Sequence, residues 1–146
     1  MSVRENIASN LLTVISNISS PITIRKATRQ PFLLDELSEQ QYPAIIVQTS
    51  EENRDDSEMG SGAKTRHGTI DFVISGFVKG SDSNIDTKRN ELITAIETAI
   101  EIDITRNGNA LDSEVVQVET DEGSLFPIGG IRMTIRCMYE YQAGTP

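Results

Sequence analysis

The chain has 146 residues, a formal net charge of −9 and a hydrophobic fraction of 37%. This length is typical of a single domain with one core, and the surplus of carboxylates repels phosphate backbones, so a nucleic-acid-binding role is not expected. No stretch approaches the roughly 20 apolar residues needed to cross a bilayer, and the N-terminus lacks a signal-peptide pattern. We therefore expect one domain over residues 1–146, made in the cytosol.

The first predicted element is a helix over about residues 3–17. Ser2 and Glu5 have the spacing of a capping box, and Asn17 and Pro21 mark the end. Apolar residues recur between them at steps of three and four: Val3, Ile7, Leu11, Val14 and Ile18. This pattern predicts a helix with one face on a sheet. Beyond it, Ile22 and Ile24 are compatible with a short strand.

The next predicted strand, residues 44–48, is a run of apolar residues typical of a strand covered on both faces. It is followed by an acidic stretch, residues 51–63, with five carboxylates, one arginine and two glycines. Such a composition cannot build a core, and loops of this length are usually functional or disordered. We expect a flexible acidic loop at about 51–63.

The second half of the chain predicts a strand over 65–79, in which Gly76 is a candidate bulge, and a helix over about 84–102. A strand near 114–120 and an acidic turn at 120–123 follow. The closing strand, 131–141, alternates most clearly, and its predicted inward residues are Ile131, Met133, Ile135, Cys137, Tyr139 and Tyr141. Cys137, the only cysteine, is interpreted as a core residue.

Together these elements predict an α+β fold in a single domain. The expected order is αβββαββ, with a mixed, mainly antiparallel β-sheet packed with two α-helices.

Catalytic motifs are not evident in the sequence. There is no P-loop, dinucleotide fingerprint or nucleophile elbow, and His67 is the only histidine. The acidic stretch lacks the spacing of a calcium loop, and its carboxylates are expected to be solvated rather than desolvated as a glycosidase acid requires. We expect no enzyme activity and no cofactor, and we interpret the stretch as an interaction loop.

Basic residues at alternate strand positions are a second candidate for contacts. In the simplest interpretation these residues form a solvated face of the sheet. In the alternative they form a subunit contact in which the basic flank of one subunit meets the acidic flank of the next. The residues predicted for a subunit or tube interface are therefore Glu51, Glu52, Arg54, Asp55, Asp56, Glu58, Lys64, Arg66, Arg132 and Arg136.

The succession of segments resembles one known family. The segments are Tyr42-Pro43-Ala44-Ile45-Ile46-Val47, the acidic stretch, the strand from Gly68 to Val78, the helix from Arg89 to Ile100, and the closing hairpin from Asp121 to Tyr141. In this order they resemble the tail terminator, or tail completion, proteins of long-tailed bacteriophages, over roughly residues 3–141.

The resemblance implies a structural virion protein. By analogy the chain is a subunit of a hexameric ring that caps the tail tube, ends its polymerisation and joins the tail to the head or neck. The implied partners are further copies of the chain, the tail tube protein, a neck, head-completion or connector protein and, in a contractile tail, the sheath terminus. DNA would pass through the lumen without specific binding. The implied location is the head–tail junction of the virion, assembled in the host cytoplasm.

Two alternatives stay open at this point. One is another head–tail joining part, such as a neck, stopper or adaptor protein. The other is a small metal- or ligand-binding domain that uses the carboxylates near Asp55.

Overall fold

Two helices and five strands form along the described residues, in the order predicted from the sequence. The computed structural model describes residues 2–56, 65–123, 125–142 and 144. The elements are α1 (Val3–Ser16), β1 (Lys26–Thr28), β2 (Ala44–Asp56), β3 (Thr65–Lys79), α2 (Ile85–Ile102), β4 (Asp112–Thr120) and β5 (Ile128–Gln142). Two short 3-10 turns, Leu34–Glu36 and Glu39–Gln41, lie between β1 and β2.

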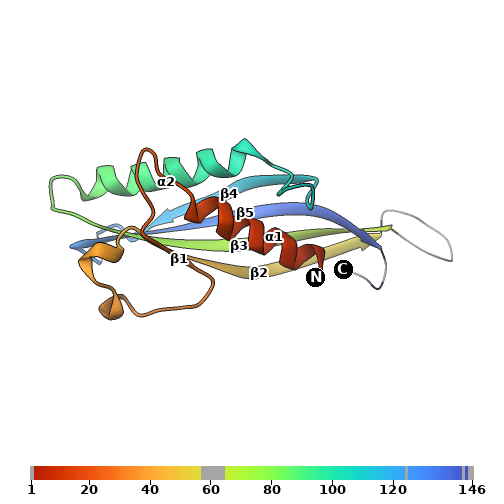
Figure 1. Cartoon of the computed structure of the whole chain (residues 1–146), viewed down its shortest axis with the longest axis horizontal. Helices are drawn as coiled ribbons and strands as arrows, with labels where there is room; N and C mark the ends of the chain where they lie inside the picture. Colours follow the sequence, from red (N-terminus) through yellow and green to blue (C-terminus); the bar gives the residue numbers. More distant parts are fainter. Residues whose placement is uncertain (1, 57–64, 124, 143, 145–146) are drawn as a thin grey trace.

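The strands form one sheet in the order β1-β2-β3-β5-β4. The pairing of β1 with β2 is parallel and the other three pairings are antiparallel. The long strands β2, β3 and β5 run side by side for most of the molecule's length (Figure 1). The α+β class, the order αβββαββ and the mixed, mainly antiparallel sheet are therefore confirmed.

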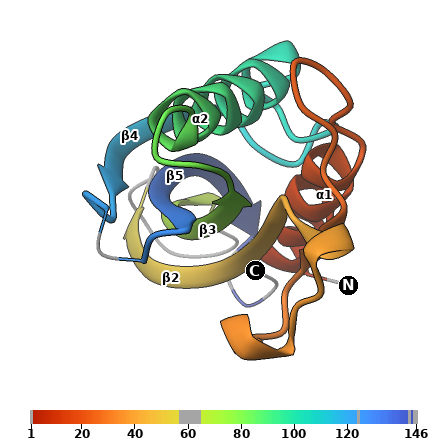
Figure 2. The same cartoon turned by 90° about the vertical axis from the view of Figure 1, so that its left-hand side faces the viewer.

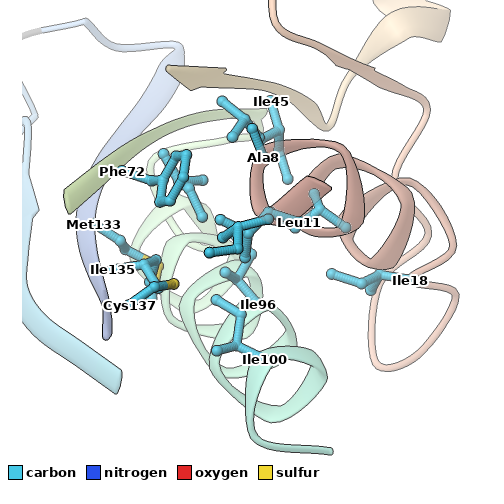
Figure 3. Packing of buried hydrophobic residues seen from close by; sticks show 14 of the residues in the cluster. Ala8, Leu11, Ile18, Ile45, Phe72, Ile96, Ile100, Met133, Ile135 and Cys137 are labelled. Atoms are coloured by element: carbon cyan, nitrogen blue, oxygen red, sulfur yellow. The ribbon is translucent and has the colours of Figure 1, made fainter. Parts of the chain in front are cut away.

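Both helices pack on the same face of a curled sheet, as the end-on view in Figure 2 shows. Side chains that alternate along β3, such as Phe72 and Ile74, point to this face and are fully buried. Leu11 from α1 and Ile96 from α2 close the core over them (Figure 3). The helical spacing of apolar residues and the period-two spacing in the strands thus meet in one core.

The closing strand β5 keeps the alternation that its sequence predicts. All six residues predicted to point inward are buried, and Arg132, Arg136 and Glu140 between them are exposed. Cys137 is buried as expected, and its thiol and the Ser113 hydroxyl share a hydrogen bond at 3.4 Å. Burial raises the pKa of the Cys137 thiol, which is consistent with a residue that serves in packing.

The first part of the predicted acidic loop, residues 51–56, is strand instead. Residues 51–56 continue β2, where Arg54 pairs with Gly68 and Asp56 with Arg66 in the register with β3. The prediction rested on the polar composition of these residues, but their backbone pairs with the long strand β3 and is therefore extended. A register shift between Thr49 and Glu52 separates this part of β2 from the part before it. The remainder of the predicted loop, 57–63, lies outside the described residues.

Two further local expectations were wrong. The short first strand is at Lys26–Thr28 and not at Ile22 and Ile24, because the segment is fixed by parallel pairing with Ala44–Ile46. Gly76 is not at a bulge, since it pairs in regular register on both sides. A Cβ there would lie 2.8 Å from a methyl carbon of Leu92, so this glycine allows α2 to approach the sheet closely.

An ion pair fastens α2 to the turn between β4 and β5. Arg89, 8% exposed, donates to Asp121 at 2.7 Å and to Asp86 at 3.0 Å. Burial alone would raise the pKa of the Asp121 carboxyl, but backbone N–H groups of Leu125 and Gly123 together with Arg89 outweigh burial and hold that pKa below its usual value. The turn is therefore held by a charged, hydrogen-bonded contact.

Candidate assembly surface

The described ends of β2, β3 and β5 project past both helices as a three-stranded arm (Figure 1). We define the arm as residues 51–56, 65–69 and 138–142. Register pairs hold its strands together: His67 of β3, for example, lies between Asp55 and Glu140. Because this part of the sheet lacks a helical cover, other groups must shield its core-side face.

A polar network centred on Glu52 provides part of that shield. The Glu52 side chain is only 13% exposed. Its carboxylate accepts a hydrogen bond from the Tyr139 hydroxyl and forms an ion pair with Arg54 at 2.7 Å. Arg4, at the start of α1, lies 3.9 Å away. Burial raises the pKa of the Tyr139 hydroxyl to about 12, and the contact with the Glu52 carboxylate adds to the rise.

Aromatic rings provide the rest of the shield. The rings of Tyr139 and Tyr141 lie 5.6 Å apart, and the guanidinium of Arg54 lies 4.9 Å from the centre of the Tyr141 ring. A Cβ on Gly68 would lie 2.6 Å from the Tyr139 ring, so the ring rests on the bare backbone of β3. Tyr139 and Tyr141 thus extend the buried hydrophobic cluster into the arm, where cation–π, aromatic and polar contacts surround them.

The structure gives the predicted acidic residues different environments. Glu51 is exposed, while Glu52 and Arg54 are engaged with each other and with the two tyrosines and so are not the solvated loop residues we expected. The backbones of Asp55 and Asp56 belong to β2. Glu58 lies outside the described residues.

The predicted basic residues do not share one face. Arg66 has the same strand parity as the buried Phe72 and therefore lies on the core side of the sheet, while Arg132 and Arg136 lie on the open side. The Arg136 guanidinium donates two hydrogen bonds to the Asp71 carboxylate, from Nε at 2.9 Å and from Nη2 at 3.2 Å. Lys64 lies outside the described residues. Among the described residues, Arg66 therefore does not share a face with Arg132 and Arg136.

Arg132 is also close to an acidic residue on the open face. Its register partner in β4 is Glu119, and its partner in β3 is Ser75. Together with the pair of Arg136 and Asp71, this places a carboxylate close to each of the two arginines on the open face. These carboxylates offset the charges of Arg132 and Arg136, and a role of the two arginines in a subunit contact stays a prediction.

Sequence reasoning missed the role of the arm's inward residues. Tyr139 and Tyr141 were predicted to be buried, but their partners Glu52, Arg54 and Gly68 were assigned to a loop or to no role. A glycine inside a strand pattern signals close approach by another group, and Gly68 carried that signal.

Neither a metal-binding cluster nor a membrane-spanning helix is found in the described part of the chain. Over residues 2–56, 65–123, 125–142 and 144, no group of three or more His, Cys, Asp or Glu side chains is arranged to hold a metal ion. Within the same residues, neither helix is long and apolar enough to cross a membrane.

Comparisons with known proteins give structural likenesses but no sequence match. No family model matches the chain, and no curated protein matches it. The structure is similar to a chain of a solved structure described as the virion of a native gene transfer agent (GTA) particle, with 11% sequence identity and a TM-score of 0.41. The likeness covers 96% of this chain and 92% of that chain. A similarity this distant does not assign a function, which must come from the chain's own residues and surfaces.

Proposed function

We propose that this chain is a structural component of a phage-like virion, and specifically a subunit of a ring that caps a tail tube and ends its growth. The observation that carries the proposal is the agreement between the segment order that resembles tail terminator proteins and the observed αβββαββ order. The chain acts without catalysis in this proposal. Its partners are other copies of itself, the tail tube protein and a neck or connector protein.

The sheet edges support a role in ending growth. The outer edge of β2 beyond Ile46 has no strand partner among the described residues, and β4 is the opposite edge of the sheet. Each edge contains a register shift, between Thr49 and Glu52 in β2 and between Val115 and Gln117 in β4. Bulges and charges on an edge discourage the addition of another strand. Such a subunit can dock on a tube without offering a template for the next ring.

The arm supports a role in docking. Its contacts are internal, so its shape does not depend on a partner, and its open side presents Met138, which is 45% exposed, beside Thr69. A preformed surface with an exposed apolar side chain binds a partner at lower entropic cost than a flexible loop. We propose that the open side of the arm contacts the tube.

The charge of the chain suits passage of DNA. A net charge of −9 repels phosphate groups, so a ring of such subunits lets DNA pass through its lumen without binding it. This part of the proposal concerns net charge and assigns no residue to the lumen.

Growth of tubes from purified tube protein tests the function. Light scattering is followed after the chain is added in amounts far below those of the tube protein. We expect growth to stop early, because each ring blocks one end. Undiminished growth to the same final scattering, with the chain in excess over tube ends, would contradict the proposal.

A matched pair of variants tests the arm. Met138→Glu places a charge on the open side of the arm, and we expect it to weaken arrest while the thermal midpoint stays near that of the wild type. Asp82→Lys changes an exposed residue in the turn before α2 and should leave arrest intact. Equal arrest by both variants would remove the arm from the docking surface.

A further inference from the structure

An apolar groove lies between the C-terminal halves of α1 and α2. It has a volume of about 400 Å³ and is lined mainly by small and aliphatic side chains. The apolar lining residues are Val14, Ile18, Ala95, Ala99 and Ile102. Ile102 is 81% exposed, the highest value for a large hydrophobic residue in the described part of the chain. An exposed aliphatic side chain beside an apolar groove is typical of a protein contact.

The rim of this groove is acidic. Asp103 lines the groove itself. Glu97 and Glu101 line an adjacent hollow on α2, which shares Thr98 and Ile102 with the groove. Residues 90–122 carry nine carboxylates and a single basic residue, Arg106, which is buried. No basic residue occupies the last turn of α1, whose C-terminal end also borders the groove. The groove therefore suits an apolar side chain accompanied by cations.

One segment of this same chain has that chemistry. Leu33 is 66% exposed, and the twelve residues before it include three cations and no carboxylate. Lys26 lies 5.3 Å from the centre of the Phe32 ring, which places a cation next to the Leu33 position. Arg25 is exposed as well. The third cation, Arg29, is engaged by Glu5 at 2.7 Å.

The other exposed hydrophobic residues are less suitable. Four of them lie in the acidic stretch 90–122: Ile104, Leu111, Val116 and Val118. Leu125 and Phe126 follow Asp121 and Glu122 in the chain. Met138 lies between Arg136 and Glu140, which are engaged by Asp71 and His67. Acidic residues also follow Leu33, at positions 35 and 36, so the positive part of its segment is the half that precedes it.

We propose that the groove between α1 and α2 receives the segment 25–33 of a second copy of the chain, with Leu33 against Ile102 and Lys26 beside Glu97 and Glu101. The inference rests on the proposed ring, and it names the surfaces that join neighbouring subunits. The segment from 29 to 41 (orange) and α2 lie on opposite sides of the molecule in Figures 1 and 2. A contact between two different surfaces is heterologous, so repeating it produces a ring if the rotation closes.

Zero-length cross-linking tests the proposal. A carbodiimide joins a lysine amine to a carboxylate only when the two groups touch. Equal amounts of ¹⁴N- and ¹⁵N-labelled chain are cross-linked in solution and on tube ends, and mass spectrometry identifies links between copies. We expect an intermolecular amide between Lys26 and Glu97 or Glu101. Absence of this link in both settings, or links from Glu97 and Glu101 to tube protein instead, would overturn the proposal.

Three variants sharpen the test. Lys26→Arg keeps the charge and removes the amine, so it should abolish the link and preserve assembly. Ile102→Asp and Leu33→Asp alter exposed side chains, so both should stay folded and each should reduce the link yield at least tenfold. The double variant Asp82→Lys/Glu122→Lys, in exposed turns, is the matched surface control and should leave the yield unchanged.

The result separates this inference from the proposed function. If tubes are capped but the link between Lys26 and Glu97 or Glu101 is missing, the subunit contact is wrong and the capping function stands. If the link forms but tubes grow uncapped, the contact stands and the function is wrong.

Discussion

The helix-covered part of the sheet and the arm have the same alternation of side chains but are stabilised in different ways. Under the helices, inward positions of β3 and β5 hold aliphatic residues together with Phe72, Met133 and Cys137, and this cluster packs against α1 and α2. In the arm, the inward positions hold Gly68, Tyr139 and Tyr141, shielded by Glu52 and Arg54. Period-two alternation therefore predicts which face is inward, while the partners available on that face decide what the residues must be.

The first prediction tests the covered part and carries the largest effect. Phe72→Ala should lower the free energy of unfolding by about 3–5 kcal/mol, because it leaves a cavity under both helices. Met138→Ala, at a half-exposed position of the arm, should change it by less than about 0.5 kcal/mol. Urea unfolding measures both. A loss below 1 kcal/mol for Phe72→Ala would mean that the core does not depend on this ring.

The second prediction concerns the charged contact that fastens α2. Asp121→Asn removes one partner of a pair whose side chains are under 10% exposed, and should cost about 3 kcal/mol at pH 7. Because the folded-state pKa of Asp121 is lowered, its stabilisation is present above the unfolded pKa of about 3.9 and is lost as the pH falls further.

Chemical unfolding from pH 7 to pH 2.5 checks this dependence. The difference between wild type and Asp121→Asn should shrink below about pH 4. Glu122→Gln, one residue away and exposed, is the control and should show little difference at any pH. A difference between wild type and Asp121→Asn that persists at the lowest pH would contradict the role assigned to the charge.

The third prediction tests the packing of the arm. Gly68→Ala should cost about 1–3 kcal/mol, because the new methyl group meets the Tyr139 ring and forces it to move. The same substitution in a Tyr139→Ala background should cost much less, since the ring is absent. The double-mutant cycle, measured by thermal or urea unfolding, reports the coupling directly. An unchanged cost in both backgrounds would show that the two residues do not interact.

The fourth prediction tests the polar part of the same network. Tyr139→Phe should cost about 1.5 kcal/mol at pH 7, because the hydrogen bond to a charged carboxylate is lost. The folded-state pKa of Tyr139, about 12, lies above the unfolded value near 10, so the advantage of the wild type is complete below pH 10 and declines as the pH rises towards 12. Unfolding at pH 8 and pH 11 should show a narrowing gap, and a constant gap would argue against the contact.

The sequence predicted the fold class well because its strongest signals are local periodicities. The helical spacing before Asn17 and the alternation from Ile131 to Tyr141 both arise from contact with one shared core. Composition gave the wrong prediction for residues 51–56, which are too polar for a core strand. They extend β2 because their backbone hydrogen-bonds to the long strand β3.

The candidate surface was harder to predict because it depends on residues far apart in sequence. Glu52 and Tyr139 come into contact only because of the register of the strands in the sheet. The same register places Arg66 of β3 on the opposite face from Arg132 and Arg136 of β5. The groove between the helices depends on their relative placement, which single-element periodicity does not specify. The local clue to it was Ile102, an apolar residue that lies off the buried stripe of α2, two residues after the buried Ile100.

Imaging of tube ends tests the central claim most directly. Purified chain is incubated with tail tubes, and electron microscopy scores the fraction of ends that carry an added ring and the distribution of tube lengths. The proposed function predicts a ring at one end of most tubes, with lengths fixed after the ring is added. Bare ends on tubes that continue to lengthen would contradict it.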